Sequence, residues 1–166
     1  MIAFFDVGYG VHGARVGCLT ATDFGELYPS AEWVVDVSTV AAYVPGEFWR
    51  RELDPLLRGF AQAPGTLEAC VIDAYVDLGA DRSPGLGRIL HQMVGVPVIG
   101  VAKSRFHGTP LEFEVHRRSS SRPLFVSAAG LSLSVAKQAV QDMAGSGRIP
   151  KLVRRADQLS RGAPIT

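Results

Sequence analysis

The order of apolar segments constrains the fold of this chain more than any other feature. Two continuous apolar runs, "LEACVID" (67–73) and "VPVIGVA" (96–102), have the pattern of strands buried on both faces of a sheet. Segments whose apolar residues recur at helical spacing precede them, over 53–60 and 88–94. This helix–strand, helix–strand order predicts an α/β fold, in which an open sheet carries helices on its faces.

The first forty residues have a different pattern. Three apolar or alternating segments, 1–10, 14–22 and 32–40, are joined by short connections rich in Gly, Pro or Ser, which predicts an antiparallel three-strand meander. No repeat or composition break marks a second domain, so we expect one domain over residues 1–166 with a mixed sheet. Further strands are expected over 111–117 and 123–129, a loop over 74–87, and helices over 133–144 and 149–160.

Composition excludes a disordered chain, since 47% of the residues are hydrophobic and 20% are charged. Cys18 and Cys70 both lie in apolar runs, which favours inert buried thiols in a reducing compartment over a disulfide. The first residues lack a basic leader followed by a long apolar segment, and no apolar run is long enough to cross a membrane. We therefore expect a cytoplasmic protein without a membrane partner, and no obligate protein partner is evident.

Charge is distributed unevenly along the chain. Residues 1–101 hold six Lys/Arg and twelve Asp/Glu, a balance of −6, whereas residues 102–166 hold eleven and four, a balance of +7. Such halves suit a protein that binds a cation with one part and a polyanion with the other. The alternative is that both are solvated faces whose charges segregated by chance.

Two acids fall at the ends of predicted strands. Asp6 ends the first strand and Asp73 ends the fourth, and ligand sites in open α/β sheets lie at the carboxyl ends of strands. If these strands are neighbours, the two carboxylates converge, and with Glu52 from the first long helix they would suit Mg²⁺ or Mn²⁺. Taken singly, an aspartate at a strand end is more often a turn or capping residue.

Several segments resemble the endonuclease V family in order along the chain. They are "FFDVGY" (4–9), "YVPGEFWRRE" (43–52), "VIDAY" (71–75), "PVIGVAKS" (97–104) and the basic end "RIPKLVRRADQLS" (148–160). The resemblance implies a ribonuclease H-like fold and a metal-dependent endonuclease that acts on DNA or RNA containing inosine. It also implies that Asp6, Glu52 and Asp73 hold the metal, Mg²⁺ or Mn²⁺, and that Lys103 assists near the scissile phosphate. The alternative for Lys103 is a solvated loop lysine.

The same resemblance implies residues that contact nucleic acid. Tyr43, Val44 and Pro45 would form a wedge inserted at the lesion, although Tyr43 also fits a half-buried aromatic at a strand end. Gly100 and Ala74 would lie at the lesion pocket. Basic residues late in the chain would contact the nucleic-acid backbone and make binding salt-dependent: Arg117, Arg118, Lys151, Arg154, Arg155 and Arg161.

Some positions depart from the family pattern. Ala74 stands where the family has glycine, so a Cβ would intrude on the pocket, and 77–85 replaces a His-Pro-Arg segment. Ala129 or Gly130 stands where the family carries a histidine close to the metals, and Ala42 replaces a proline. Two alternatives therefore stay open: a nucleic-acid-binding module without catalysis, and a nuclease of the same fold with altered lesion specificity.

Overall fold

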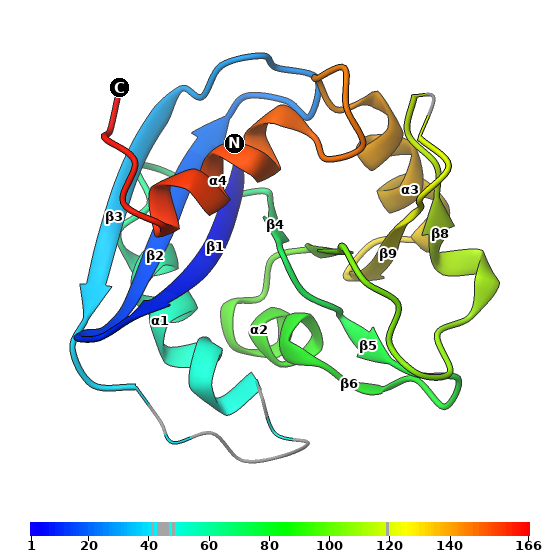
Figure 1. The fold of residues 1–166 in the computed structure, drawn as a ribbon, viewed down its shortest axis with the longest axis horizontal. Coiled ribbons are helices and arrows are strands. Elements are labelled where there is room, and N and C mark those ends of the chain that lie inside the picture. The colour runs from blue at the N-terminus through cyan, green and yellow to red at the C-terminus, as the bar shows by residue number, and fades with distance from the viewer. Residues whose placement is uncertain (41, 43–46, 48, 119) are drawn as a thin grey trace.

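A seven-stranded mixed sheet forms the centre of the molecule, with the strand order β3-β2-β1-β4-β7-β9-β8 (Figure 1). The computed structural model describes residues 1–40, 42, 47, 49–118 and 120–166. The strands of the sheet are β1 (Ile2–Gly10), β2 (Gly13–Ala21), β3 (Ala31–Val37), β4 (Ala69–Ile72), β7 (Val98–Ala102), β8 (Glu114–Val115) and β9 (Leu124–Ala129). The helices are α1 (Trp49–Ala61), α2 (Leu86–Val94), α3 (Leu133–Asp142) and α4 (Lys151–Ser160).

The strand directions confirm the predicted sheet. β1, β2 and β3 form an antiparallel meander, β1 pairs with β4 in parallel, and β4 pairs with β7 in parallel. β9 then returns antiparallel to β7 and carries β8 at the edge. The parallel strands β4 and β7 are therefore central, which explains why their sequences are apolar throughout.

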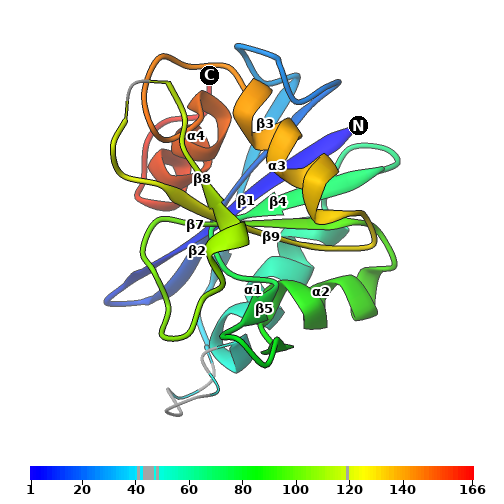
Figure 2. The same cartoon turned by 90° about the vertical axis from the view of Figure 1, so that its right-hand side faces the viewer.

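Helices cover both faces of the sheet, with α3 and α4 on one side and α1 and α2 on the other (Figure 2). Alternate residues of each strand point to opposite faces, so Phe4 packs in the core under α3 and α4 while Phe5 packs in the core under α1 and α2. Val71 and Ile72 divide in the same way in β4. Two apolar layers therefore hold the sheet in place.

Two segments differ from the sequence prediction. The expected loop 74–87 contains a short hairpin of β5 (Asp77–Leu78) and β6 (Ser83–Pro84), and its last two residues already belong to α2. The expected strand over 111–117 begins instead as a 3-10 turn, η1 (Leu111–Phe113), closed by the Phe113 N–H donating to the Pro110 carbonyl at 3.1 Å. Leu111 is 76% exposed, so the alternating pattern there overstates the length of the buried strand.

Both cysteines are buried within the sheet, Cys18 in β2 and Cys70 in β4, and neither forms a disulfide. Burial raises the pKa of the Cys70 thiol to about 12, so this group stays protonated near neutral pH. Within the described ranges, no helix has both the length and the apolar character needed to cross a membrane.

Candidate active site

The register of β1 and β4 brings two predicted acids together. The parallel pairing of these strands ends with Phe5 opposite Ile72, and Asp6 and Asp73 are the next residues on the two neighbouring strands. β4 ends there, but β1 continues to Gly10 along β2, so the prediction that Asp6 ends its strand is wrong: Asp6 lies within β1, beside the carboxyl end of β4. The sequence predicted that the carboxylates of Asp6 and Asp73 would converge if their strands were neighbours. The structure confirms that β1 and β4 are neighbours and that the two carboxylates lie close together.

A third carboxylate, which the sequence analysis did not single out, comes from α4. Asp6, Asp73 and Asp157 each offer one oxygen, and these oxygens lie within 4.8 Å of one another. The hydroxyl of Ser160, one helical turn after Asp157, donates to Oδ2 of Asp6 at 2.6 Å. Asp157 is the only acid in α4 and lies four residues after the buried Val153, a spacing that could have indicated an inward-facing acid.

Two glycines allow α4 to approach the sheet closely enough for these contacts. A Cβ at Gly17 in β2 would overlap the carbonyl oxygen of Ala156, and a Cβ at Gly8 in β1 would lie 2.5 Å from the carbonyl oxygen of Ser160. Both obstacles are helix backbone, which cannot rotate away as a side chain can. The missing side chains at Gly8 and Gly17 therefore set the position of Asp157 and Ser160 over β1.

Glu52 reaches the same place from α1, on the opposite face of the sheet. It lines a pocket of about 10 Å³ together with Asp6 and Asp73, a space suited to about one water-sized particle. Burial raises the pKa of Glu52 to about 8, and the charges of Asp6 and Asp73 act in the same direction. The three oxygens that lie within 4.8 Å of one another do not include one from Glu52, so Asp157 takes its place in the tightest group.

Glu52 gives the metal-free protein a predicted pH dependence of stability. Its pKa rises from 4.5 to about 8 on folding, so the folded chain retains a proton that the unfolded chain releases in this interval. The contribution of Glu52 to stability is fully present below pH 4.5 and is lost as the pH rises through about 8. The free energy of unfolding should fall by roughly 1.4 kcal/mol per pH unit between these values.

Urea unfolding in the presence of a chelator, repeated across that interval, measures this effect. Glu52→Gln should remove most of the slope, because an amide does not titrate. An identical slope in the wild type and the Gln variant would show that Glu52 is not the titrating group.

Burial also raises the pKa of Asp6, and the neighbouring charges of Asp73 and Asp157 add to this, while the Ser160 hydrogen bond opposes it. Lys103, directly after β7, forms an ion pair with Asp73 and lies 3.5 Å from Oδ1 of Asp157. Burial lowers the pKa of Lys103, but the hydrogen bond and charge of Asp73 more than offset this, so the pKa is raised and the ammonium persists. The predicted lysine thus adjoins the acids, and its action on phosphate stays a prediction.

The two residues predicted at the lesion pocket contact each other. A Cβ at Gly100 would overlap the carbonyl oxygen of Ala74 and would lie 2.9 Å from the amide nitrogen of Val76. The Val76 N–H donates to Oγ of Ser127 at 2.8 Å, which holds this backbone over Gly100. The backbone of Ala74 and Val76 therefore covers Gly100. Ala74 also lines the small pocket beside the carboxylates.

The predicted wedge residues Tyr43, Val44 and Pro45 lie outside the described residues, and their role stays a prediction. Gly130 is one of the two candidates for the position where the family carries a histidine. It has a positive φ of 76°, and a Cβ there would lie 2.7 Å from Cε1 of His91. In the described part of the chain, Asp157 is a further acid beside Asp6 and Asp73 that the sequence analysis did not expect.

The basic residues predicted to contact nucleic acid differ in availability. Arg117 is 1% exposed and donates to the carbonyl oxygens of Met143 and Gly147. The prediction that it contacts the nucleic-acid backbone is therefore wrong. Arg155 donates through Nε and a terminal nitrogen to both carboxylate oxygens of Glu32, at 2.6 and 2.7 Å, which commits its guanidinium to this pair. A charge count along the sequence cannot distinguish such structural arginines from binding ones.

Other basic residues of this set remain at the surface. Arg118 and Arg154 are exposed, and the Lys151 ammonium lies 3.9 Å from the ring centroid of Tyr28. Arg161 is exposed and donates to Oδ1 of Asp157 at 3.0 Å. The exposed members of the set are thus Arg118, Arg154 and Arg161, and of these the guanidinium of Arg161 contacts an acid of the cluster directly.

Comparisons with known proteins agree with this geometry. Residues 1–120 match the sequence profile of the family described as Endonuclease V. The chain is 30% identical to Endonuclease V of Azotobacter vinelandii over 184 aligned residues, which cover 96% of this chain and 81% of that protein. The crystal structure of Endonuclease V from Bacillus subtilis has a similar fold, with a TM-score of 0.78 at 18% identity over 96% of this chain and 78% of that one.

A second similar structure is Ciona intestinalis Endonuclease V in complex with a 24mer DNA containing an inosine followed by a ribo-adenosine. Its TM-score is 0.77 at 20% identity, over 96% of this chain and 83% of that one. These likenesses confirm the ribonuclease H-like mixed sheet flanked by helices. Since the profile match covers residues 1–120 of the 166 and the Azotobacter vinelandii relative aligns over nearly the whole chain, the chain belongs to the endonuclease V family of nucleases.

Proposed function

We propose that this protein is a divalent-metal-dependent endonuclease that hydrolyses a phosphodiester bond near inosine in DNA or RNA. The observation that carries the proposal is the cluster of Asp6, Asp73 and Asp157, which forms where the parallel pairing of β1 and β4 ends and has Lys103 beside it. Family membership and the inosine-containing DNA bound to the Ciona intestinalis protein support the same conclusion.

A divalent cation fits the chemistry of the cluster. Carboxylate oxygens are the hard ligands that Mg²⁺ and Mn²⁺ prefer, and these ions need only one or two carboxylates besides water and substrate phosphate. Burial and, to a smaller extent, the like charges of neighbouring acids raise the pKa values of Asp6 and Glu52, so a bound cation would favour their charged forms. Asp6, Asp73 and Asp157 would hold the ion, with Glu52 lining the pocket from the other side.

Each side chain then has a role that follows from its position. When bound, a divalent ion supplies an activated water and neutralises charge that develops on the leaving oxygen. Ser160 fixes the orientation of Asp6 by donating a hydrogen bond to Oδ2. The ammonium of Lys103, held between Asp73 and Asp157, is within reach of a phosphate oxygen at the cluster and would offset its charge.

Cleavage of labelled oligonucleotides tests the proposal. We expect strands containing one inosine to be cut in Mg²⁺ or Mn²⁺, and the activity to disappear on chelation and return with the metal. A matched strand with guanosine in place of inosine serves as the control, in both DNA and RNA. Salt-dependent binding without any metal-dependent cleavage would reject the nuclease and favour a binding module.

A nuclease with altered lesion specificity is the second candidate. Ala74, which stands where the family has glycine, lines the pocket beside Asp6 and Asp73, so its methyl group narrows the space next to the acids. A panel of inosine, uracil, abasic, mismatch and flap substrates separates the two candidates. Under this second candidate Ala74→Gly should raise cleavage at inosine relative to the other substrates, and an unchanged order of substrates would exclude it.

A further inference from the structure

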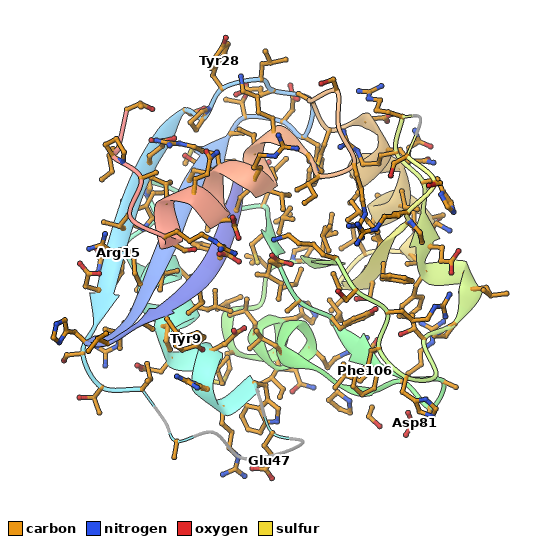
Figure 3. All side chains as sticks on the ribbon, viewed as in Figure 1. Tyr9, Arg15, Tyr28, Glu47, Asp81 and Phe106 are labelled. Carbon is orange, nitrogen blue, oxygen red and sulfur yellow. The ribbon has the colours of Figure 1, made fainter. Side chains whose placement is uncertain are left out.

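Lys103 is the first residue after β7, and the pairing of β7 with β9 does not extend to it. The last pair in this register is Ala102 with Phe125. Beyond Lys103 the chain leaves the sheet, and Figure 3 shows Phe106 at the lower right, on the same side as Asp81 in the β5–β6 turn. Strand pairing therefore does not fix the backbone that carries this lysine.

A guanidinium from another segment binds this backbone instead. Arg148, in the connection between α3 and α4, donates through a terminal nitrogen to the carbonyl oxygen of Lys103. The same guanidinium donates to the carbonyl oxygen of Pro123, the residue before β9, from Nε at 3.2 Å and from that terminal nitrogen at 2.7 Å. Arg148 thus joins the end of β7 to the start of β9, next to the ion pair of Lys103 with Asp73.

The segment that carries Arg148 is itself held in place. Arg117 donates from Nη1 to the carbonyl oxygens of Gly147 and Arg148, at 2.9 and 3.2 Å. Three residues after Arg148 the chain enters α4, the helix that supplies Asp157. Arg148 therefore ties the backbone of Lys103 to the start of the helix whose acid lies 3.5 Å from the Lys103 ammonium.

The positive charge of Arg148 is unfavourable at this position. Among the described residues its guanidinium has no carboxylate partner, and burial lowers its pKa, with the charge of Arg122 acting in the same direction. A neutral side chain would avoid the cost of desolvating a cation. A planar guanidinium, however, donates to two carbonyl groups at once in a fixed geometry, which the ammonium of a lysine on its flexible stem does not do.

We propose that Arg148 is a positioning residue for the reaction: by binding the carbonyl oxygens of Lys103 and Pro123, it fixes the backbone from which the Lys103 ammonium reaches the carboxylate cluster. Arg148 acts through Lys103 and not on the substrate. Its loss lets the ammonium move relative to Asp73 and Asp157, which slows cleavage while the strand still binds. The inference rests on the proposed function, because Lys103 has a phosphate to act on only if the cluster is the cleavage site.

Single-turnover cleavage of an inosine-containing strand in Mg²⁺ tests this role. We expect Arg148→Met and Arg148→Lys each to lower the rate roughly tenfold, with the Kd of the strand within about a factor of two of the wild-type value. Arg148→Lys keeps the positive charge but not the contact with two carbonyl groups, so a wild-type rate in this variant would overturn the proposal.

Arg122→Met is the matched control. Arg122 is exposed and directly precedes Pro123, and in the described ranges its side chain donates to no carbonyl group. The change removes a positive charge beside Arg148 without removing a contact to Lys103, so the cleavage rate should stay at the wild-type level. A tenfold loss in this variant as well would mean that charge at this surface, and not the position of Lys103, controls the rate.

A double-mutant cycle separates positioning from a general structural defect. If Arg148 acts through Lys103, Arg148→Met in a Lys103→Met background should change the rate by less than about a factor of two. A further loss by the full factor in that background would overturn the proposal, because the defect would then be independent of Lys103. Should Arg148→Met fail to fold, Arg148→Lys takes its place in the cycle.

Lysine signals provide a measurement that needs no turnover. The chain has three lysines, Lys103, Lys137 and Lys151, so the ¹³Cε NMR spectrum of lysine-labelled protein is simple. In a chelator, Arg148→Met should move the Lys103 signal toward that of a mobile side chain, while Lys137, which donates to the Glu112 carbonyl on another part of the surface, keeps its signal. An unchanged Lys103 signal would overturn the proposal. A shifted Lys103 signal without cleavage of any strand would support the placement of Lys103 by Arg148 and reject only the proposed nuclease.

Discussion

Replacing either Asp6 or Asp73 with alanine is expected to slow cleavage of an inosine-containing strand by about a thousandfold or more. Each change removes one of the three oxygens that lie within 4.8 Å of one another. Charge stabilisation by a bound divalent ion is worth several kcal/mol at the transition state, and each 1.36 kcal/mol corresponds to about a factor of ten in rate. Single-turnover rates at saturating enzyme in Mg²⁺ measure the loss without a contribution from product release.

Asp54→Ala is the matched control for this experiment. Asp54 lies on α1 two residues from Glu52, but its side chain is 58% exposed and pairs only with Arg58 among the described residues, at 2.8 Å. Loss of the Asp54 carboxylate should leave the cleavage rate within about a factor of two of the wild-type rate, because exposed ion pairs contribute little. Full activity of both the Asp6 and Asp73 variants would reject the metal site.

Stability measurements separate lost chemistry from lost folding in these variants. Burial raises the pKa of Asp6, with Asp73 and Asp157 acting in the same direction, so its charged form is unfavourable in the metal-free protein. Asp6→Asn should therefore unfold at the same or a higher urea concentration than the wild type in a chelator. A lower urea midpoint would mean that the Asp6 carboxylate stabilises the metal-free fold, which its raised pKa argues against.

Gly17→Ala is expected to destabilise the protein by about 3 kcal/mol or more and to reduce cleavage with it. The new Cβ would overlap the carbonyl oxygen of Ala156 and would lie 2.5 Å from the amide nitrogen of Ser160. Both atoms belong to the backbone of α4, so the helix must move away from β2 as a unit. That movement displaces Asp157 and Ser160 from Asp6, which couples the loss of stability to the loss of activity.

Gly10→Ala in the neighbouring strand β1 makes the same chemical change in open space. No atom lies within 4 Å of the added Cβ, so stability should change by less than about 0.5 kcal/mol. Urea unfolding of both variants gives the comparison directly. If Gly17→Ala were as stable as Gly10→Ala, α4 could not be packed on β2 as closely as the structure has it.

The local order of elements could be predicted because its signals are local. The apolar runs that became β4 and β7 and the helical spacing of α2 depend on neighbouring residues alone, and these elements formed where expected. The predicted strand over 111–117 was too long, because only Glu114–Val115 form β8. Alternation of apolar and polar residues does not show whether each apolar side chain is buried. Leu111 alternates correctly and is exposed.

By itself the sequence determined that the chain forms a mixed sheet with helices and that Asp73 follows a strand, whereas Asp6 lies within β1 and not at its end. Only the tertiary structure decided that β1 and β4 are adjacent, that Asp157 completes the cluster, and that Arg117 is a buried structural residue. The reason is that pairing of strands and docking of α4 depend on contacts between residues far apart in the chain. Asp6 and Ser160, 154 positions apart, share a hydrogen bond because glycines in β1 and β2 let the helix come close.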